Sequence, residues 1–135
     1  MDWMKTYHED HKSVMILLAK FTGNVMDLKA GMSTPNTFVE FREFADIINN
    51  VIIPHFKSEE TNIYVEIKKK SPAGSDFIDD MLQEHEELYS LFDAYITAVE
   101  AQDTAIIVDI STRLEHVLRH HIIKEEDQLP SFLNN

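Results

Sequence analysis

The fold is decided by the stretch IVDISTRLEHVLRHHIIKEEDQ at residues 107–128, where apolar residues recur at alternating steps of three and four. This spacing is typical of an α-helix with one face turned to a core. The predicted inward face carries Ile107, Ile110, Leu114, Val117, His121, Glu125 and Gln128. A histidine and, one turn later, a glutamate therefore interrupt an otherwise apolar face.

The same interruption occurs in three earlier segments of helical periodicity. The first inward face is Met4, Tyr7, His11, Val14, Leu18, Phe21, Val25 and Leu28. The second is Phe41, Phe44, Ile48, Val51, His55, Glu59 and Ile63. The third is Ile78, Met81, His85, Leu88, Tyr89, Phe92, Tyr95 and Val99. Each of the four faces thus contains one histidine, and two of them also contain a glutamate one turn after it.

Breaks between these segments lie at residues 31–35 and 71–74, which are rich in Gly and Pro, and at AQDT, residues 101–104. We expect helices at about 4–30, 37–69, 75–100 and 104–128. A capping box of Thr37 with Glu40 would start the second helix, and Asp103 would cap the fourth. Short connections make neighbouring helices antiparallel, so the sequence predicts an all-α, up-down-up-down four-helix bundle formed as one domain over residues 1–135.

Composition excludes several classes of function. The chain of 135 residues has 12 Lys and Arg against 24 Asp and Glu, a formal net charge of −12, which disfavours nucleic acid and anionic membranes as partners. It has no apolar run near the ~20 residues of a membrane span, and its start lacks the apolar core of a signal peptide, so we expect a cytoplasmic protein. Without cysteine, any transition metal must be held by histidine and carboxylate.

A helical rise of ~1.5 Å per residue places the six inward polar residues in one layer of the bundle. They are His11, His55, Glu59, His85, His121 and Glu125. Burial of a polar group without a partner costs on the order of 2 kcal/mol, and burial of a bare carboxylate costs far more. A metal would be the partner of all six, and a purely hydrogen-bonded His/Glu network is the alternative.

The spacing favours two metal ions over one. His55 and Glu59, like His121 and Glu125, are i, i+4 pairs whose side chains can address one centre, and carboxylates can bridge metals about 3.5 to 4 Å apart. Ligation by His and carboxylate without sulfur favours iron or manganese. Four imidazoles, two bridging carboxylates and a bridging oxygen would fill about ten of the roughly twelve positions of two six-coordinate ions, leaving room for a small ligand.

Other polar residues have simpler interpretations. We expect His8, His116 and His120 to be exposed, and the i, i+4 pair of the last two could take up a stray metal ion during purification. The run at residues 68–70 is three lysines at a helix C-terminus, where cations are favourable. Pro54 is expected to bend the second helix and to aim His55. The remaining acidic residues near His85, which are Glu84, Glu86 and Glu87, have the pattern of a solvated face.

Four pieces of the sequence resemble the hemerythrin-like HHE cation-binding domain family. They are HEDHKSVMILL at 8–18, IIPHFKSEE at 52–60, QEHEEL at 83–88 and RHHIIKEEDQLP at 119–130. The resemblance covers nearly the whole chain. It implies a four-helix bundle that holds two non-haem iron ions with an oxo or hydroxo bridge, with His11, His55, Glu59, His85, His121 and Glu125 as ligands.

The chain departs from the oxygen-carrying members of that family at two positions. They have a second histidine one turn after the third-helix histidine, where this chain has Tyr89. This favours the related four-histidine di-iron proteins, including those that resemble the repair-of-iron-centres group. Tyr89 could contact the bridge, bind ferric iron weakly or be a core aromatic. The last acidic ligand of the oxygen carriers lies one residue further on, so Glu126 is a substitute for Glu125, and Glu60 is one for Glu59.

The open coordination positions predict a small ligand, and the resemblance implies that the protein binds or senses a diatomic one, dioxygen or nitric oxide, at a di-iron centre. A binding protein is expected before a multiple-turnover enzyme. The alternatives are a redox enzyme that activates dioxygen, peroxide or nitric oxide, and a protein that donates iron for repair of iron centres. Ferritin-like iron oxidation is disfavoured because the Glu-x2-His pairs of that class are absent. A further hypothesis is a helical bundle without metal that binds another protein. The sequence identifies no protein partner.

Overall fold

The computed structural model describes residues 3–133, with side chains from residue 5 onward, so the predicted inward side chain Met4 lies outside the described residues. Its helices are α1 (Trp3–Lys29), α2 (Pro35–Ile47), the π-helical segment η1 (Ile48–Ile52), α3 (Ile53–Thr61), α4 (Ile63–Lys70), α5 (Pro72–Ala101) and α6 (Thr104–Leu133). Over residues 3–133 there is no strand, which confirms the all-α class.

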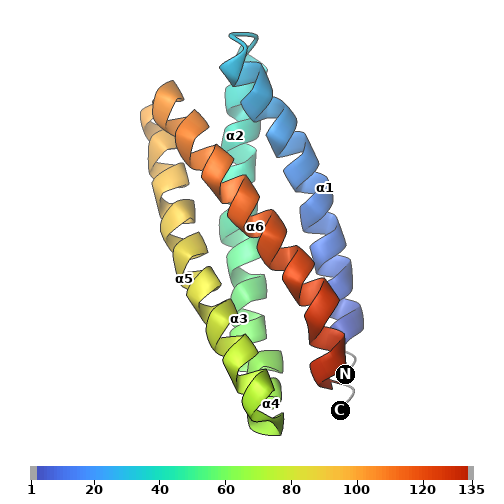
Figure 1. Cartoon of the computed structure of the whole chain (residues 1–135). Coiled ribbons are helices and arrows are strands. Elements are labelled where there is room, and N and C mark those ends of the chain that lie inside the picture. The colour runs from blue at the N-terminus through green and yellow to red at the C-terminus, as the bar shows by residue number, and fades with distance from the viewer. Residues whose placement is uncertain (1–2, 134–135) are drawn as a thin grey trace.

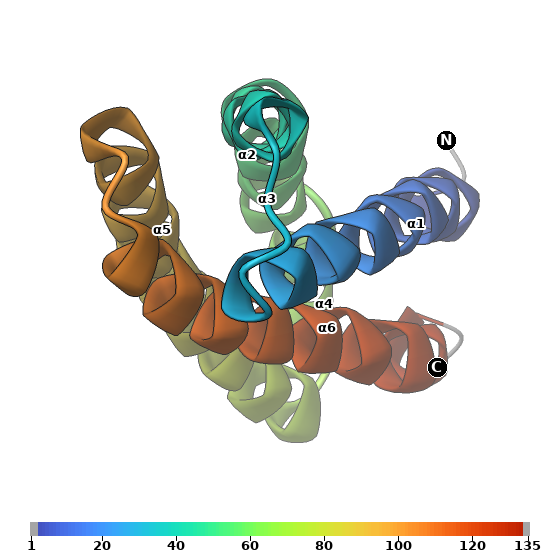
Figure 2. The ribbon, with the colours of Figure 1, turned by 90° about the horizontal axis from the view of Figure 1, so that it is seen from above.

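These helices form four rods, of which the second is built from α2, η1, α3 and α4 in succession (Figure 1). α1 packs against α2 and α6, and α5 packs against α2, α4 and α6. The rods therefore make a closed ring, which Figure 2 shows from above. The α1–α2 turn lies at one end of the bundle, and the α4–α5 turn, the start of α1 and the end of α6 lie at the other (Figure 1). Among residues 3–133, each helix is too short or too polar to cross a bilayer.

Two apolar clusters fill the bundle, one on each side of the predicted polar layer. The larger contains Leu18, Phe21, Phe41, Phe92 and Leu114, and the smaller contains Tyr7, Ile63, Phe77, Met81 and Leu129. Every rod passes from one cluster to the other through an inward polar residue. The polar side chains therefore lie in a buried layer between two packed apolar clusters, where an unpaired charge would be destabilising.

The second rod is less regular than its periodicity predicted. One turn, η1, is π-helical and ends just before Pro54, whose ring cannot supply a backbone N–H to the helix. The extra residue shifts the inward face, so Ile52 is 1% exposed while the predicted Val51 is 44% exposed. A second irregularity, at Asn62 with φ −119° and ψ −84°, separates α3 from α4.

Helix ends differ from the prediction by at most five residues, and the start of the last helix at Thr104 agrees with it. Thr34, not Thr37, is the N-cap of α2, Pro35 takes the first helical position, and the Thr37 hydroxyl accepts the Thr34 N–H at 3.0 Å. α5 begins at Pro72, and α6 continues through Pro130 to Leu133.

Along α6 the inward residue near the end is Leu129, and the predicted Gln128 is exposed. Asp103 caps α6 as predicted, by accepting the Ile106 N–H at 3.2 Å.

Candidate metal centre

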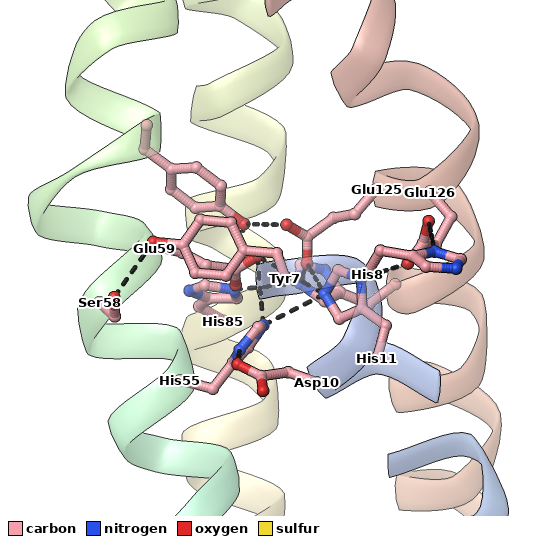
Figure 3. A network of polar contacts seen from close by, with 12 residues as sticks. Tyr7, His8, Asp10, His11, His55, Ser58, Glu59, His85, Glu125 and Glu126 are labelled. Atoms are coloured by element: carbon pink, nitrogen blue, oxygen red, sulfur yellow. Dashed lines mark hydrogen bonds and ion pairs between the residues drawn. The ribbon is translucent and has the colours of Figure 1, made fainter. Parts of the chain in front are cut away.

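The six predicted residues come together in one buried group. Figure 3 shows His11, His55, Glu59, His85 and Glu125 of this group. α1 contributes His11, α3 contributes His55 and Glu59, α5 contributes His85, and α6 contributes His121 and Glu125. Their exposed fractions lie between 0% and 8%. All four rods therefore meet at this layer through side chains that can bind a metal.

The four imidazoles form two pairs. Nε2 of His11 lies 3.1 Å from Nε2 of His55, and Nε2 of His85 lies 3.0 Å from Nε2 of His121. Two nitrogen atoms so close must either share a proton or share another partner. Because each pair joins two rods, a cation bound by a pair would also connect those rods.

The two carboxylates lie between the imidazole pairs. Glu59 Oε2 is 3.4 Å from His55 Nε2 and 3.7 Å from His11 Nε2, while Glu59 Oε1 is 3.4 Å from His85 Nε2. Glu125 Oε1 is 2.6 Å from His121 Nε2 and 3.8 Å from His11 Nε2. Each carboxylate therefore faces both pairs, which is the placement that a bridging ligand of a dinuclear site requires.

Each imidazole is held from behind by a carboxylate on a neighbouring rod. The Nδ1 distances are 2.8 Å from His11 to Glu126, 3.0 Å from His55 to Asp10, 2.7 Å from His85 to Glu60 and 2.9 Å from His121 to Glu84. A proton on Nδ1 that is donated to the carboxylate leaves the Nε2 lone pair directed inward. The four contacts run in a closed circuit around the ring of rods.

These outer carboxylates were not predicted in this role. The sequence offers Glu60 and Glu126 as substitutes for the inner ligands, but in the structure they hold His85 and His11 from outside. The assignment of Glu84 to a solvated face was wrong, because it holds His121 and is paired with Lys124 at 2.6 Å. Their positions next to the inner residues in the sequence could have indicated this role. Asp10 and Glu84 each directly precede an inner histidine, and Glu60 and Glu126 each directly follow an inner glutamate.

Burial and neighbouring charges shift the pKa values of the two inner carboxylates in opposite directions. Desolvation and the nearby charge of Glu125 raise the pKa of Glu59 well above its usual range. Burial also raises the pKa of Glu125, but the charge of His121 and hydrogen bonding outweigh burial and bring that pKa below its ordinary value.

The histidines are shifted by the same environment. Burial lowers the pKa of His121, but the charge of Glu125 outweighs burial and raises it to about 9. Burial and the charge of His121 lower the pKa of His85 to about 4. The two imidazoles of this pair are therefore shifted in opposite directions, since the surroundings of His121 favour its charged form and those of His85 favour its neutral form.

The chemistry of the donors fits a cation. Both oxygens of Glu59 and Oε1 of Glu125 are buried without a hydrogen-bond donor, and the close contact of Glu125 Oε1 with His121 is an ion pair without hydrogen-bond geometry. A buried carboxylate oxygen without a partner lowers the free energy of unfolding by on the order of several kcal/mol unless a positive charge faces it. Two overlapping groups could each hold a metal ion. One is Glu59, His85, His121 and Glu125, and the other is His11, His55 and Glu59.

Two tyrosines border the centre. The hydroxyl of Tyr64, on α4, donates to Glu125 Oε2 at 3.0 Å and lies 3.2 Å from His85 Nε2, and burial raises its pKa. Sequence reasoning missed Tyr64 because the break at residue 62 turns it inward beside Ile63. Tyr89 donates to Glu60 Oε2 at 2.8 Å, so in the structure it supports His85 through Glu60 instead of contacting the inner group.

The exposed histidines are where the sequence predicted them. The side chain of His8 is 63% exposed and its Nδ1 lies 3.0 Å from Glu126 Oε2, so Glu126 joins His8 to the buried His11. His116 and His120 are exposed on α6. None of the three enters the inner group.

Comparison with known proteins gives one finding. The family model of the hemerythrin HHE cation-binding domain matches residues 2–132. Neither the curated proteins nor the solved structures gave a significant match. The match covers all four rods and the whole buried His/Glu group, which is able to bind a cation. This chain belongs to the hemerythrin HHE cation-binding domain family.

Proposed function

We propose that the chain binds two non-haem iron ions, joined by an oxo or hydroxo bridge, and uses them to bind or sense a small diatomic ligand, dioxygen or nitric oxide. The observation that carries the proposal is the position of Glu59, with one oxygen 3.4 Å from His55 Nε2 and the other 3.4 Å from His85 Nε2. A carboxylate in this position can serve two ions at once.

The inner residues would serve as ligands in two groups and as bridges between them. His11 and His55 would hold one ion, His85 and His121 the other, and Glu59 and Glu125 both. Iron suits this donor set because imidazole and carboxylate without thiolate favour it, and a reduced iron pair supplies the electrons that binding of dioxygen or nitric oxide requires. The outer carboxylates fix the imidazole tautomers, and the two apolar clusters keep bulk water from the layer.

The number of donors supports a ligand-binding role. Four imidazoles and two bridging carboxylates leave about four of the roughly twelve coordination positions, and after the bridging oxygen takes two of them about two remain for a small ligand. The Tyr64 hydroxyl donates to Glu125 Oε2 at 3.0 Å and lies 3.2 Å from His85 Nε2, so it would orient Glu125 at the inner edge of the group.

The test is metal content followed by spectroscopy. Protein without a histidine tag, purified without oxygen, should contain about two irons per chain, as a two-metal site requires. Its optical spectrum should change on addition of air and, in a separate sample, of nitric oxide. One zinc ion and no response to either gas would contradict the proposal.

A pair of glutamine variants ties the result to the site. Glu59→Gln should lose one or both irons because the amide cannot supply two anionic oxygens. Glu86→Gln changes the same charge at an exposed position of α5 and should keep the iron and the spectrum. Unchanged iron content in Glu59→Gln would rule out the proposed bridging role. Repeated turnover with a reductant would instead identify a redox enzyme.

A further inference from the structure

A second set of metal-binding side chains lies outside the buried centre. His116 and His120 are four residues apart on the outer face of α6, both exposed, with ring centroids 4.3 Å apart and ring planes at 51°. Among the described residues, neither ring has a hydrogen-bond partner. Both imidazoles therefore face water from the same side of a helix.

The pair borders a surface hollow of about 260 Å³ between α5 and α6. The hollow also contains two carboxylates, and each already has a cationic partner. Glu84 is paired with Lys124 at 2.6 Å, and Glu87 is paired with Arg113. The charged groups of the hollow balance, so its attraction for a metal ion must come from the imidazole nitrogens. This excludes a site for Mg²⁺ or Ca²⁺, which require oxygen ligands.

We propose that His116 and His120 form a second, solvent-exposed site for a divalent transition-metal ion. Two histidines at i and i+4 on one helix face are the arrangement with which helical motifs bind zinc. Imidazole ligands and the general order of affinities favour Cu²⁺, Ni²⁺ and Zn²⁺. Water completes the coordination, which makes the ion exchangeable.

This surface site is distinct from the buried centre. His120 and His121 are adjacent in sequence, but ~100° of helical rotation separates their directions. His121 is 0% exposed and its Nδ1 is held by Glu84, whereas His120 is exposed. An ion at the surface pair therefore needs no change in the inner group.

Calorimetric titration of the iron-loaded full chain with Zn²⁺ tests the site, with iron measured before and after. We expect one zinc bound per chain without loss of iron. His120→Gln should weaken that binding at least about tenfold, because loss of even an indirect metal-site partner commonly costs 10- to 100-fold. Glu86→Gln changes an exposed side chain that does not line the hollow, and it should leave the surface stoichiometry unchanged.

Three results would overturn the proposal. The first is absence of zinc binding beyond the centre. The second is binding that survives the double change His116→Gln with His120→Gln. The third is loss of iron from that double variant, which would make the pair part of the buried centre. Cu²⁺ bound to the native chain should show two imidazole nitrogens by electron paramagnetic resonance, and the double variant should lose that signature.

Discussion

At the scale of single residues, the decisive feature is that neighbouring glutamates in the sequence have different roles. Glu59 and Glu125 point into the layer, while the adjacent Glu60 and Glu126 hold histidines from outside. The ~100° step between consecutive helical residues places two carboxylates of the same chemistry in different surroundings. One pair supplies charge to the centre, and the other sets the orientation of the imidazoles.

A first prediction concerns Glu84. Glu84→Ala should lower the affinity of the centre for iron by about 10- to 100-fold, because His121 loses the acceptor that directs its Nε2 inward. Competition with a chelator of known affinity measures the change. Glu86→Ala, two residues along the same helix and exposed, should have no such effect. Equal affinities of the two variants would show that the outer contact does not position His121.

A second prediction concerns Tyr95, which is fully buried and donates to the Phe41 carbonyl at 2.8 Å. Burial raises its pKa, so above pH ~10 the unfolded tyrosine loses a proton that the folded one keeps. The folded state then binds more protons, and stability falls as pH rises.

Urea unfolding from pH 8 to 11.5 measures this loss. Tyr95→Phe should reduce the alkaline slope by up to about 1.4 kcal/mol per pH unit, the value for one proton. Tyr64, whose pKa is also raised, should remain as a second contributor. An unchanged slope in Tyr95→Phe would assign the alkaline loss to other groups.

At the scale of elements, the turn between α4 and α5 depends on close backbone approach. A Cβ on Gly74 would lie 2.8 Å from the Ile67 carbonyl oxygen and 3.1 Å from the Ser71 Oγ that accepts the Gly74 N–H. The absence of a side chain thus lets α5 begin directly against α4. This turn sets the register of His85 relative to Glu59 and Glu60.

A third prediction follows from this contact. Gly74→Ala should destabilise the fold by about 1–3 kcal/mol, the usual cost of overpacking. Gly23→Ala is the matched control, because a Cβ there meets nothing within 4 Å in the middle of α1. It should stabilise by about 0.5–1 kcal/mol through helix propensity. Urea unfolding of both variants gives the comparison, and a stabilising Gly74→Ala would contradict the packing argument.

At the scale of the whole molecule, the polar layer is both the site and a weak point of the core. It separates the two apolar clusters and carries buried carboxylate oxygens without donors. Across this layer, the imidazole nitrogens and carboxylate oxygens of different rods contact one another. A bound cation would therefore act on the stability of the entire bundle.

A fourth prediction is that removal of metal lowers stability. Free metal at 100 times its dissociation constant adds about 2.7 kcal/mol when it binds only the native state. Thermal unfolding with and without a strong chelator measures the difference. The Glu59→Gln variant should be far less sensitive to chelator. A native chain equally stable under both conditions would instead fit a metal-free interaction bundle.

The sequence by itself determined the helical class and the six inward polar positions, because both follow from a period that repeats every turn. The burial of His11, His55, Glu59, His85, His121 and Glu125 agrees with that period. Errors arose where the local period changed. The π-helical turn moved Ile52 inward in place of Val51, and Leu129 replaced Gln128 near the end of α6.

Only the tertiary structure decided which atoms meet. The contact between Glu126 and His11 joins residues 115 positions apart, and that between Glu60 and His85 joins residues 25 apart. No helical period relates such residues, since their distance depends on how separate rods are rotated and aligned in height. Tyr64 reaches Glu125 for the same reason. The donor types are local properties of the chain, whereas their convergence and outer support are properties of the packed bundle.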